Sequence, residues 1–126
     1  MTPCLAPGDR LGIEWWSAEV TPDCRPGELV LAREGAEGWI LHRVVERTPT
    51  GTLVTRGDRA YAAESLHVDQ VFGRVRLIQF ASELRVRPFR VNRLDRAIAW
   101  LSSRGSPGRP TRALIRSLGW LRRELL

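Results

Sequence analysis

Lysine is absent from this sequence, and all 20 of its basic residues are arginine. A guanidinium keeps its proton throughout the physiological pH range, so any mechanism that needs a neutral lysine as general base is excluded. Cysteine is scarce as well: Cys4 and Cys24 are the only two, and cysteine and histidine nowhere cluster with the spacing of a zinc site. We therefore expect two free, buried thiols rather than a disulfide, and neither a metal nor an organic cofactor.

Long apolar runs are also missing. No stretch of about 18 apolar residues occurs, so the sequence predicts neither a transmembrane helix nor a signal peptide. The expected location is the cytoplasm or the periphery of a membrane. A chain of 126 residues, 43% of them hydrophobic and 27% charged, has the size and composition of one globular domain that can bury a core unaided.

Charge is distributed unevenly along the chain. Residues 1–84 hold nine arginines against twelve acidic residues, a net charge of −3. Residues 85–126 hold eleven arginines against two acidic residues, a net charge of +9. The total of +6 therefore combines a mildly acidic body with a strongly basic tail, and we place a domain boundary between them.

The hydrophobic pattern of residues 1–84 is that of short strands separated by turns. Alternating or β-branched apolar residues predict strands in five segments: 9–16, 27–33, 38–47, 53–58 and 69–80. Gly73 lies within the last of these and predicts a β-bulge. Five or six strands at this spacing predict a mainly β body that is closed or sandwiched.

The basic tail shows a helical period instead. Leu94, Ala97, Ile98 and Leu101 form one apolar stripe, and a linker rich in glycine, proline and serine follows at 103–110. We therefore expect the tail to be a helical extension of the β body.

A second helix is predicted from Thr111, which can cap its N-terminus. Its apolar stripe consists of four leucines: Leu114, Leu118, Leu121 and Leu125. The arginines lie largely off this stripe, as in a helix that rests on an anionic membrane surface. A helix packed on the β body with a solvated basic face has the same pattern, and the sequence leaves both alternatives open.

Several segments, in order, resemble the boxes of type I signal peptidases. The opening MTPCLAPGD is similar to the segment that follows the nucleophile in that family, Ser-Met-x-Pro-x-Leu-x-x-Gly-Asp, and matches it at Met1, Pro3, Leu5, Gly8 and Asp9. Four later segments resemble further boxes of the family: PGELVLAR at 26–33, ILHRVV at 40–45, VTRGDR at 54–59 and VFGRV at 71–75. In the first of these, Glu28 stands where the family has aspartate. A histidine in the second of these is typical of archaeal and endoplasmic-reticulum enzymes, where bacterial ones carry lysine. The chain thus resembles the His-containing subtype of the signal peptidase and LexA-type peptidase superfamily.

The resemblance implies a serine endopeptidase whose nucleophile stands immediately before Met1, so we expect the sequence to be truncated just after the nucleophile. Met1 and Pro3 would shape the nucleophile loop. His42 would be the general base, because a serine needs a base within hydrogen-bond reach and the chain has no lysine. In the His-type relatives the orienting acid lies six residues after the Gly-Asp aspartate, which places it at Glu64, with Asp58 as the competing acid.

Each of these candidates also has a structural interpretation. His42 lies among apolar residues, where a lone histidine is often a satisfied part of the core. Asp58 can be a turn residue whose carboxylate accepts hydrogen bonds from backbone amides. Glu64 is one methylene longer than the aspartate that the resemblance implies, which alters the geometry of a triad.

Three functions of different classes follow. The first is a signal-peptidase-like endopeptidase that binds a peptide or protein as an added β-strand and hydrolyses it with Ser, His and an acid. The second is a pseudopeptidase that binds peptides without cutting them. The third is a nucleic-acid-associated regulator, since LexA-type repressors share this fold. The lack of a lysine base and of a recognition-helix pattern argues against the third, so we do not expect nucleic acid as a partner.

Overall fold

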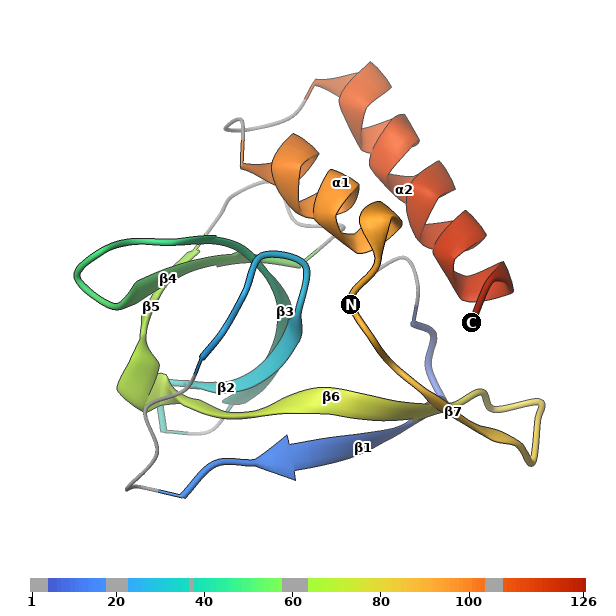
Figure 1. Cartoon of the computed structure of the whole chain (residues 1–126), viewed down its shortest axis with the longest axis horizontal. Coiled ribbons are helices and arrows are strands. Elements are labelled where there is room, and N and C mark those ends of the chain that lie inside the picture. The colour runs from blue at the N-terminus through green and yellow to red at the C-terminus, as the bar shows by residue number, and fades with distance from the viewer. Residues whose placement is uncertain (1–4, 18–22, 37, 58–63, 104–107) are drawn as a thin grey trace.

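The structure, a computed structural model, describes residues 5–17, 23–36, 38–57, 64–103 and 108–126 (Figure 1). It is mainly β, with a seven-stranded antiparallel sheet followed by two helices, which confirms the expected fold class. The strands are β1 (Arg10–Trp15), β2 (Leu29–Glu34), β3 (Gly38–Arg47), β4 (Thr52–Arg56), β5 (Glu64–His67), β6 (Val71–Gln79) and β7 (Val86–Pro88). The helices are α1 (Arg93–Ser102) and α2 (Arg109–Glu124), and a 3-10 turn, η1 (Val68–Gln70), precedes β6. None of the helices in the described ranges combines the length and apolarity that crossing a bilayer requires.

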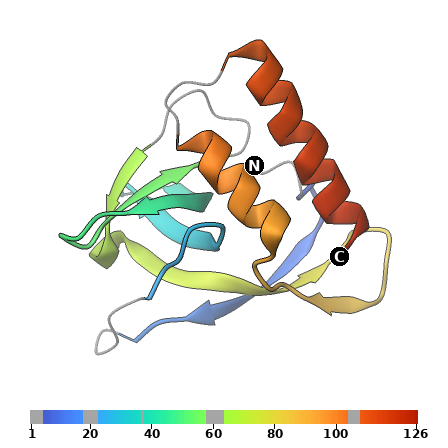
Figure 2. The same cartoon turned by 45° about the horizontal axis from the view of Figure 1, so that its top comes forward.

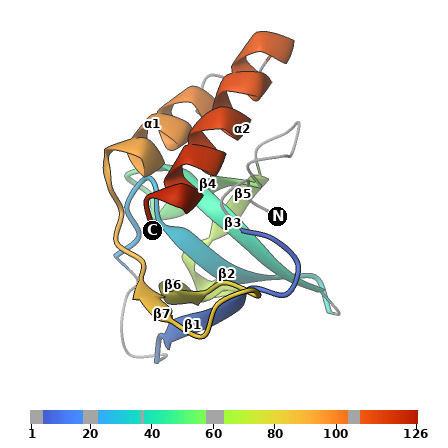
Figure 3. The same ribbon diagram turned by 90° about the vertical axis from the view of Figure 1, so that its right-hand side faces the viewer.

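The strands hydrogen-bond in the order β1-β6-β2-β3-β4-β5. β6 borders β1 along one side, while on its other side β2 pairs with its first half and β7 with its second half. The sheet is strongly curled, since β3, β4 and β5 rise away from the layer that β1 and β6 form (Figure 1 and Figure 3). The helices pack on each other and lie on one side of the curled sheet (Figure 2). The basic tail therefore contributes both a strand, β7, and the helical layer.

Two of the strands, β5 and β7, are missed by the sequence pattern. β5 has only four residues, and β7 has three and ends in Pro88, so neither is long enough for an alternation to stand out. Thr111, the expected cap of the second helix, lies inside α2 instead. The helix begins at Arg109, with Gly108 as its N-cap and a proline in the first turn, where the fixed φ of proline suits a helix start.

Gly73 marks the irregularity that the sequence predicts in β6. The register of β2 on β6 passes from Val71 to Gly73 and skips Phe72, as in a β-bulge. A Cβ on Gly73 would lie 2.5 Å from the backbone oxygen of Glu14 on β1, so glycine is required for the two strands to approach. The prediction of a bulge at this glycine is thereby confirmed.

The apolar core consists of two clusters. The first contains Leu5, Leu29, Val75, Ile78, Phe80 and Phe89. The second contains Cys24, Val30, Ala32, Val44, Leu53, Leu66 and Val71. Cys24 is a free thiol, as expected, and burial raises its pKa to about 12, which keeps the thiol neutral and inert at neutral pH. Cys4 lies outside the described residues.

A buried cluster of charges attaches the helices to the sheet. Asp95 of α1 accepts hydrogen bonds from Arg43 of β3 at 2.9 Å and from Arg122 of α2 at 2.8 Å, one on each carboxylate oxygen. Arg43 also donates to the carbonyl of Gly27, and Arg122 to the carbonyl of Arg90. Removing one member of such a buried cluster leaves an uncompensated charge, so the three partners hold α1, α2 and β3 in one arrangement.

Candidate active site

The base and the first of the two candidate acids that the resemblance implies lie side by side on the sheet. Nδ1 of His42, on β3, lies 3.4 Å from Oε2 of Glu64, at the start of β5. The hydroxyl of Thr55, on the intervening β4, lies 3.5 Å from the same ring nitrogen. The side chain of His42 is 15% exposed and that of Glu64 is 42% exposed, so the group stands at the edge of solvent rather than inside the core.

Strand register explains why these side chains meet. A hairpin turn joins β3 to β4, and hydrogen bonds between the hydroxyl of Thr48 and the backbone of Thr52 hold it. The register of β4 on β5 then pairs Thr55 directly with Glu64. On β3, His42 lies diagonally across from Thr55 on the same face, where side chains of neighbouring strands come into contact.

This geometry suits a base that is held by an acid. Because Nδ1 faces Glu64, a proton on Nδ1 can be donated to the carboxylate, and Nε2 is then the nitrogen that accepts a proton. A separation of 3.4 Å is longer than an ordinary hydrogen bond, but such contacts are often long before a substrate binds. The glutamate side chain, although longer than aspartate, does reach the imidazole.

The other predicted positions are placed as follows. Asp58, Met1 and Pro3 lie outside the described residues, so the roles assigned to them stay predictions. The second histidine, His67, is exposed and pairs with Asp69 at 3.0 Å. It caps η1 and therefore has a structural role.

The last residues of the N-terminal box are held in place by backbone and core contacts. Leu5 is buried in the first core cluster, against which Leu41, the neighbour of His42, also packs. The carboxylate of Asp9 accepts hydrogen bonds from the backbone N–H groups of Ala6 at 2.8 Å and of Ala81 at 3.1 Å. The Gly-Asp pair of the box thus closes a turn onto the end of β6.

Arg123 of α2 completes the surroundings of Asp9. Its guanidinium contacts both carboxylate oxygens, at 2.6 and 3.2 Å, and lies 4.1 Å above the ring centroid of Phe80. Burial alone would raise the pKa of Asp9, but the hydrogen bonds from Arg123, Ala6 and Ala81 outweigh burial and lower that pKa. Asp9 is therefore a structural anion that ties the box to the C-terminal helix.

The turn before β2 is also built from structural residues. Glu28, which stands where the resembling family has aspartate, accepts hydrogen bonds from the backbone of Arg25 at 2.9 Å and from Arg74 at 3.1 Å. Gly27 has a φ of 98°, and a Cβ there would lie 2.9 Å from Val91. These contacts explain the Gly-Glu pair by packing, without a catalytic role.

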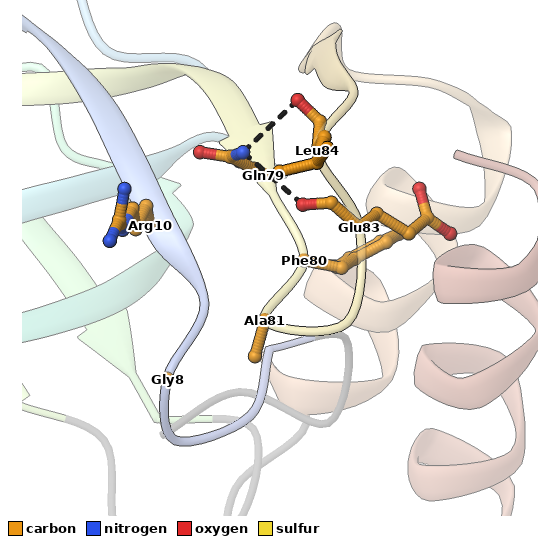
Figure 4. A pocket seen from close by; sticks show the side chains of 7 residues that line it. All are labelled: Gly8, Arg10, Gln79, Phe80, Ala81, Glu83 and Leu84. Atoms are coloured by element: carbon orange, nitrogen blue, oxygen red, sulfur yellow. Dashed lines mark hydrogen bonds between the residues drawn. The ribbon is translucent and has the colours of Figure 1, made fainter.

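A small cavity of about 170 Å³ lies between Gly8 and the loop that joins β6 to β7 (Figure 4). The amide of Gln79 donates to the carbonyl oxygens of Glu83 and Leu84 and so holds this loop. The candidate base and acid do not line the cavity, and its volume is below that of a ligand site. The cavity therefore belongs to the loop and not to the candidate active site.

Two partners of the predicted residues are missed by sequence reasoning, Thr55 beside His42 and Arg123 beside Asp9. Thr55 lies in the segment VTRGDR, where the resemblance draws attention to Asp58, and Arg123 is 114 positions away from Asp9.

Comparisons of the chain with family models, with curated proteins and with solved structures found no match. The functional interpretation therefore depends on the contacts of His42 and on the resemblance of the boxes.

Proposed function

We propose that this chain carries the base and the acid of a signal-peptidase-like serine endopeptidase. The observation that carries the proposal is the contact of His42 with Glu64 at 3.4 Å, beside the hydroxyl of Thr55. The order of the boxes supports it, since the segments ILHRVV and VTRGDR supply the adjacent strands β3 and β4. A base oriented by an acid is what a serine nucleophile needs, because the hydroxyl is weakly nucleophilic by itself.

The reaction would begin at the serine expected immediately before Met1. As its oxygen attacks the substrate carbonyl, Nε2 of His42 takes the hydroxyl proton, and Glu64 stabilises the imidazolium through Nδ1–H. The imidazolium then gives its proton to the departing amine as the C–N bond breaks, which leaves an acyl-enzyme. Water attacks the acyl-enzyme with the same base and restores the serine.

An extended peptide would bind by joining the sheet as a further strand. Among the described strands β1 pairs only with β6, and β5 pairs only with β4, so both have an open edge. The nucleophile belongs to the segment that leads into β1. We therefore assign the substrate to the edge of β1.

Supplying the nucleophile tests the proposal. A version with a short Gly-Ser leader, whose serine stands directly before Met1, is compared with a matched Gly-Ala leader and with the 126-residue chain. We expect only the Gly-Ser version to cleave extended peptides after small residues and to react with a fluorophosphonate probe. His42→Ala in that version should abolish nearly all cleavage, because base and nucleophile act as a unit. Glu64→Gln should cost more activity than Asp58→Asn.

Two results would contradict the proposal. One is a folded Gly-Ser version that neither cleaves peptides nor reacts with the probe. The other is equal cleavage by the Gly-Ala version, which would place the nucleophile elsewhere. If the folded Gly-Ser version binds peptides without cutting them, the pseudopeptidase alternative replaces the enzyme.

A further inference from the structure

The helical layer exposes several large apolar side chains to solvent. They are Trp100 of α1, and Leu114, Trp120, Leu121 and Leu125 at α2, with exposed fractions between 40% and 64%. Leu114, Leu121 and Leu125 belong to the stripe that the sequence predicts, and their spacing of seven and four residues puts them on one face of the helix. Trp120 lies about 100° around α2 from Leu121, and we call the five side chains, taken together, the outer face of the helices.

A different set of residues docks α2 onto the rest of the molecule. Ile115 and Arg122, seven positions apart, are almost completely buried, and Arg122 makes the 2.8 Å contact with Asp95. Of the four leucines in the predicted stripe, only Leu118 is half-buried. Since α2 is held through Ile115 and Arg122, the other leucines are not needed for docking and stay exposed.

Among the described residues, the exposed charged side chains of α1 and α2 are three arginines, Arg93, Arg96 and Arg116, and one acid, Glu124. Arg93 and Arg96 share a shallow, open surface of α1 with Trp100. Arg116 is exposed one turn before Trp120 on α2. In the basic tail the two acidic residues are Asp95, which is buried, and Glu124, which is exposed.

We propose that the outer face binds the surface of an anionic lipid bilayer. The arginines would lie among the headgroups, the tryptophans at the interface, and the leucines at the boundary of the acyl chains. A helical layer that exposes arginines, tryptophans and leucines on its two helices fits a bilayer, whereas a second copy of the chain would bring like charges together. This proposal is independent of the proposed peptidase activity.

Co-sedimentation of the 126-residue chain with vesicles tests the proposal. Binding is expected to mixed phosphatidylcholine–phosphatidylglycerol vesicles and not to phosphatidylcholine alone. It should weaken as salt rises but persist in part, because salt screens charges and not apolar burial. An arginine near an anionic leaflet contributes about fivefold in affinity, so the triple variant R93Q/R96Q/R116Q should bind about a hundredfold more weakly.

The leucines are tested separately from the charges. The double variant L114Q/L121Q should lose the binding that survives in high salt. Matched controls are Leu84→Gln and Arg85→Gln, two exposed positions in the loop between β6 and β7, and both should bind as the unaltered chain does. Circular dichroism and a cooperative melt are required of every variant, so that a loss of binding reports on the surface and not on folding.

Three outcomes would overturn the proposal. The first is no binding of the folded chain to anionic vesicles. The second is binding that falls log-linearly with salt, is equalled by a DNA duplex and is unaffected by L114Q/L121Q, as expected for phosphate contacts alone. The third is self-association in sedimentation velocity that L114Q/L121Q abolishes, which would assign the outer face to a second copy.

Discussion

His42 and Arg43 are neighbours on β3, and each contacts a carboxylate on an opposite face of the sheet. Arg43 meets Asp95 at 2.9 Å with both side chains completely buried, whereas His42 meets Glu64 at 3.4 Å with both partly exposed. A charge pair sealed from water cannot take part in a reaction and can only hold elements together. A histidine at the edge of solvent can exchange a proton with a substrate, so one strand carries structure on one face and candidate chemistry on the other.

The buried cations that contact Asp95 are arginines, and each of them donates hydrogen bonds to two acceptors. Arg43 donates to the carboxylate of Asp95 and to the backbone carbonyl of Gly27, each at 2.9 Å. Arg122 likewise donates to Asp95 and to the carbonyl of Arg90. Arg122 uses two nitrogens of its planar guanidinium for these contacts, Nε for the carboxylate and Nη2 for the carbonyl, whereas an ammonium group has one nitrogen. Arginine therefore satisfies both a charge and a backbone oxygen at these buried positions.

Asp95→Asn would disrupt the buried contacts of Asp95 with Arg43 and Arg122, and we expect it to have the largest effect on stability. The amide keeps the shape of the carboxylate but removes the negative charge that Arg43 and Arg122 share. We expect the free energy of unfolding to fall by about 3–5 kcal/mol, measured by urea denaturation. Asp69→Asn, at an exposed position, is the control and should change stability by less than about 0.5 kcal/mol. Equal stability of the two variants would show that Asp95 does not anchor the helices.

The contact of Asp9 with Arg123 is intermediate in burial between the Arg43–Asp95 pair and the His42–Glu64 contact. The side chain of Asp9 is buried and that of Arg123 is partly exposed. The pKa of Asp9 is lowered in the folded state, so its stabilising contribution is present above the pKa of an unfolded aspartate, about 4, and is lost as pH falls through the folded value. Asp9→Asn should remove about 1–3 kcal/mol at neutral pH and flatten the acid side of the stability curve.

Urea denaturation between neutral pH and about pH 3 measures this effect of Asp9→Asn. Glu14→Gln is the comparison: hydrogen bonds from Arg74 and Arg76 lower the pKa of Glu14 to about 2, but its side chain is exposed, and solvent screening reduces what such contacts contribute to stability. Glu14→Gln should leave most of the acid sensitivity in place. If Glu14→Gln flattens the curve and Asp9→Asn does not, the contact of Arg123 with Asp9 contributes little.

The two faces of β3 also differ in how far the sequence predicts them. The resemblance of the boxes pairs His42 with Glu64, whose side chains lie 3.4 Å apart, and β3 has its predicted bounds of 38–47. Asp95 is not found, because its partners lie 52 and 27 positions away, and an aspartate in an amphipathic helix is usually exposed. Helical periodicity identifies the leucine stripe of α2 but does not show that another face, with Arg122, is the one that packs. Long-range partners of buried charges follow from tertiary structure and not from local pattern.

The smallest effect on stability is expected at the candidate site itself. Glu64→Gln and His42→Gln should each change the free energy of unfolding by less than about 1 kcal/mol, because a partly exposed contact between a histidine and a carboxylate gains little over solvation of its members. In the Gly-Ser version the same substitutions should remove most of kcat. A large loss of kcat with little loss of stability is expected of a base and its orienting acid. Loss of a structural histidine would instead lower the stability of the fold. Urea denaturation and peptide cleavage of the same preparations measure both quantities. If Glu64→Gln destabilises the chain as much as Asp95→Asn does, the two faces of β3 are both structural, and the assignment of His42 as base is wrong.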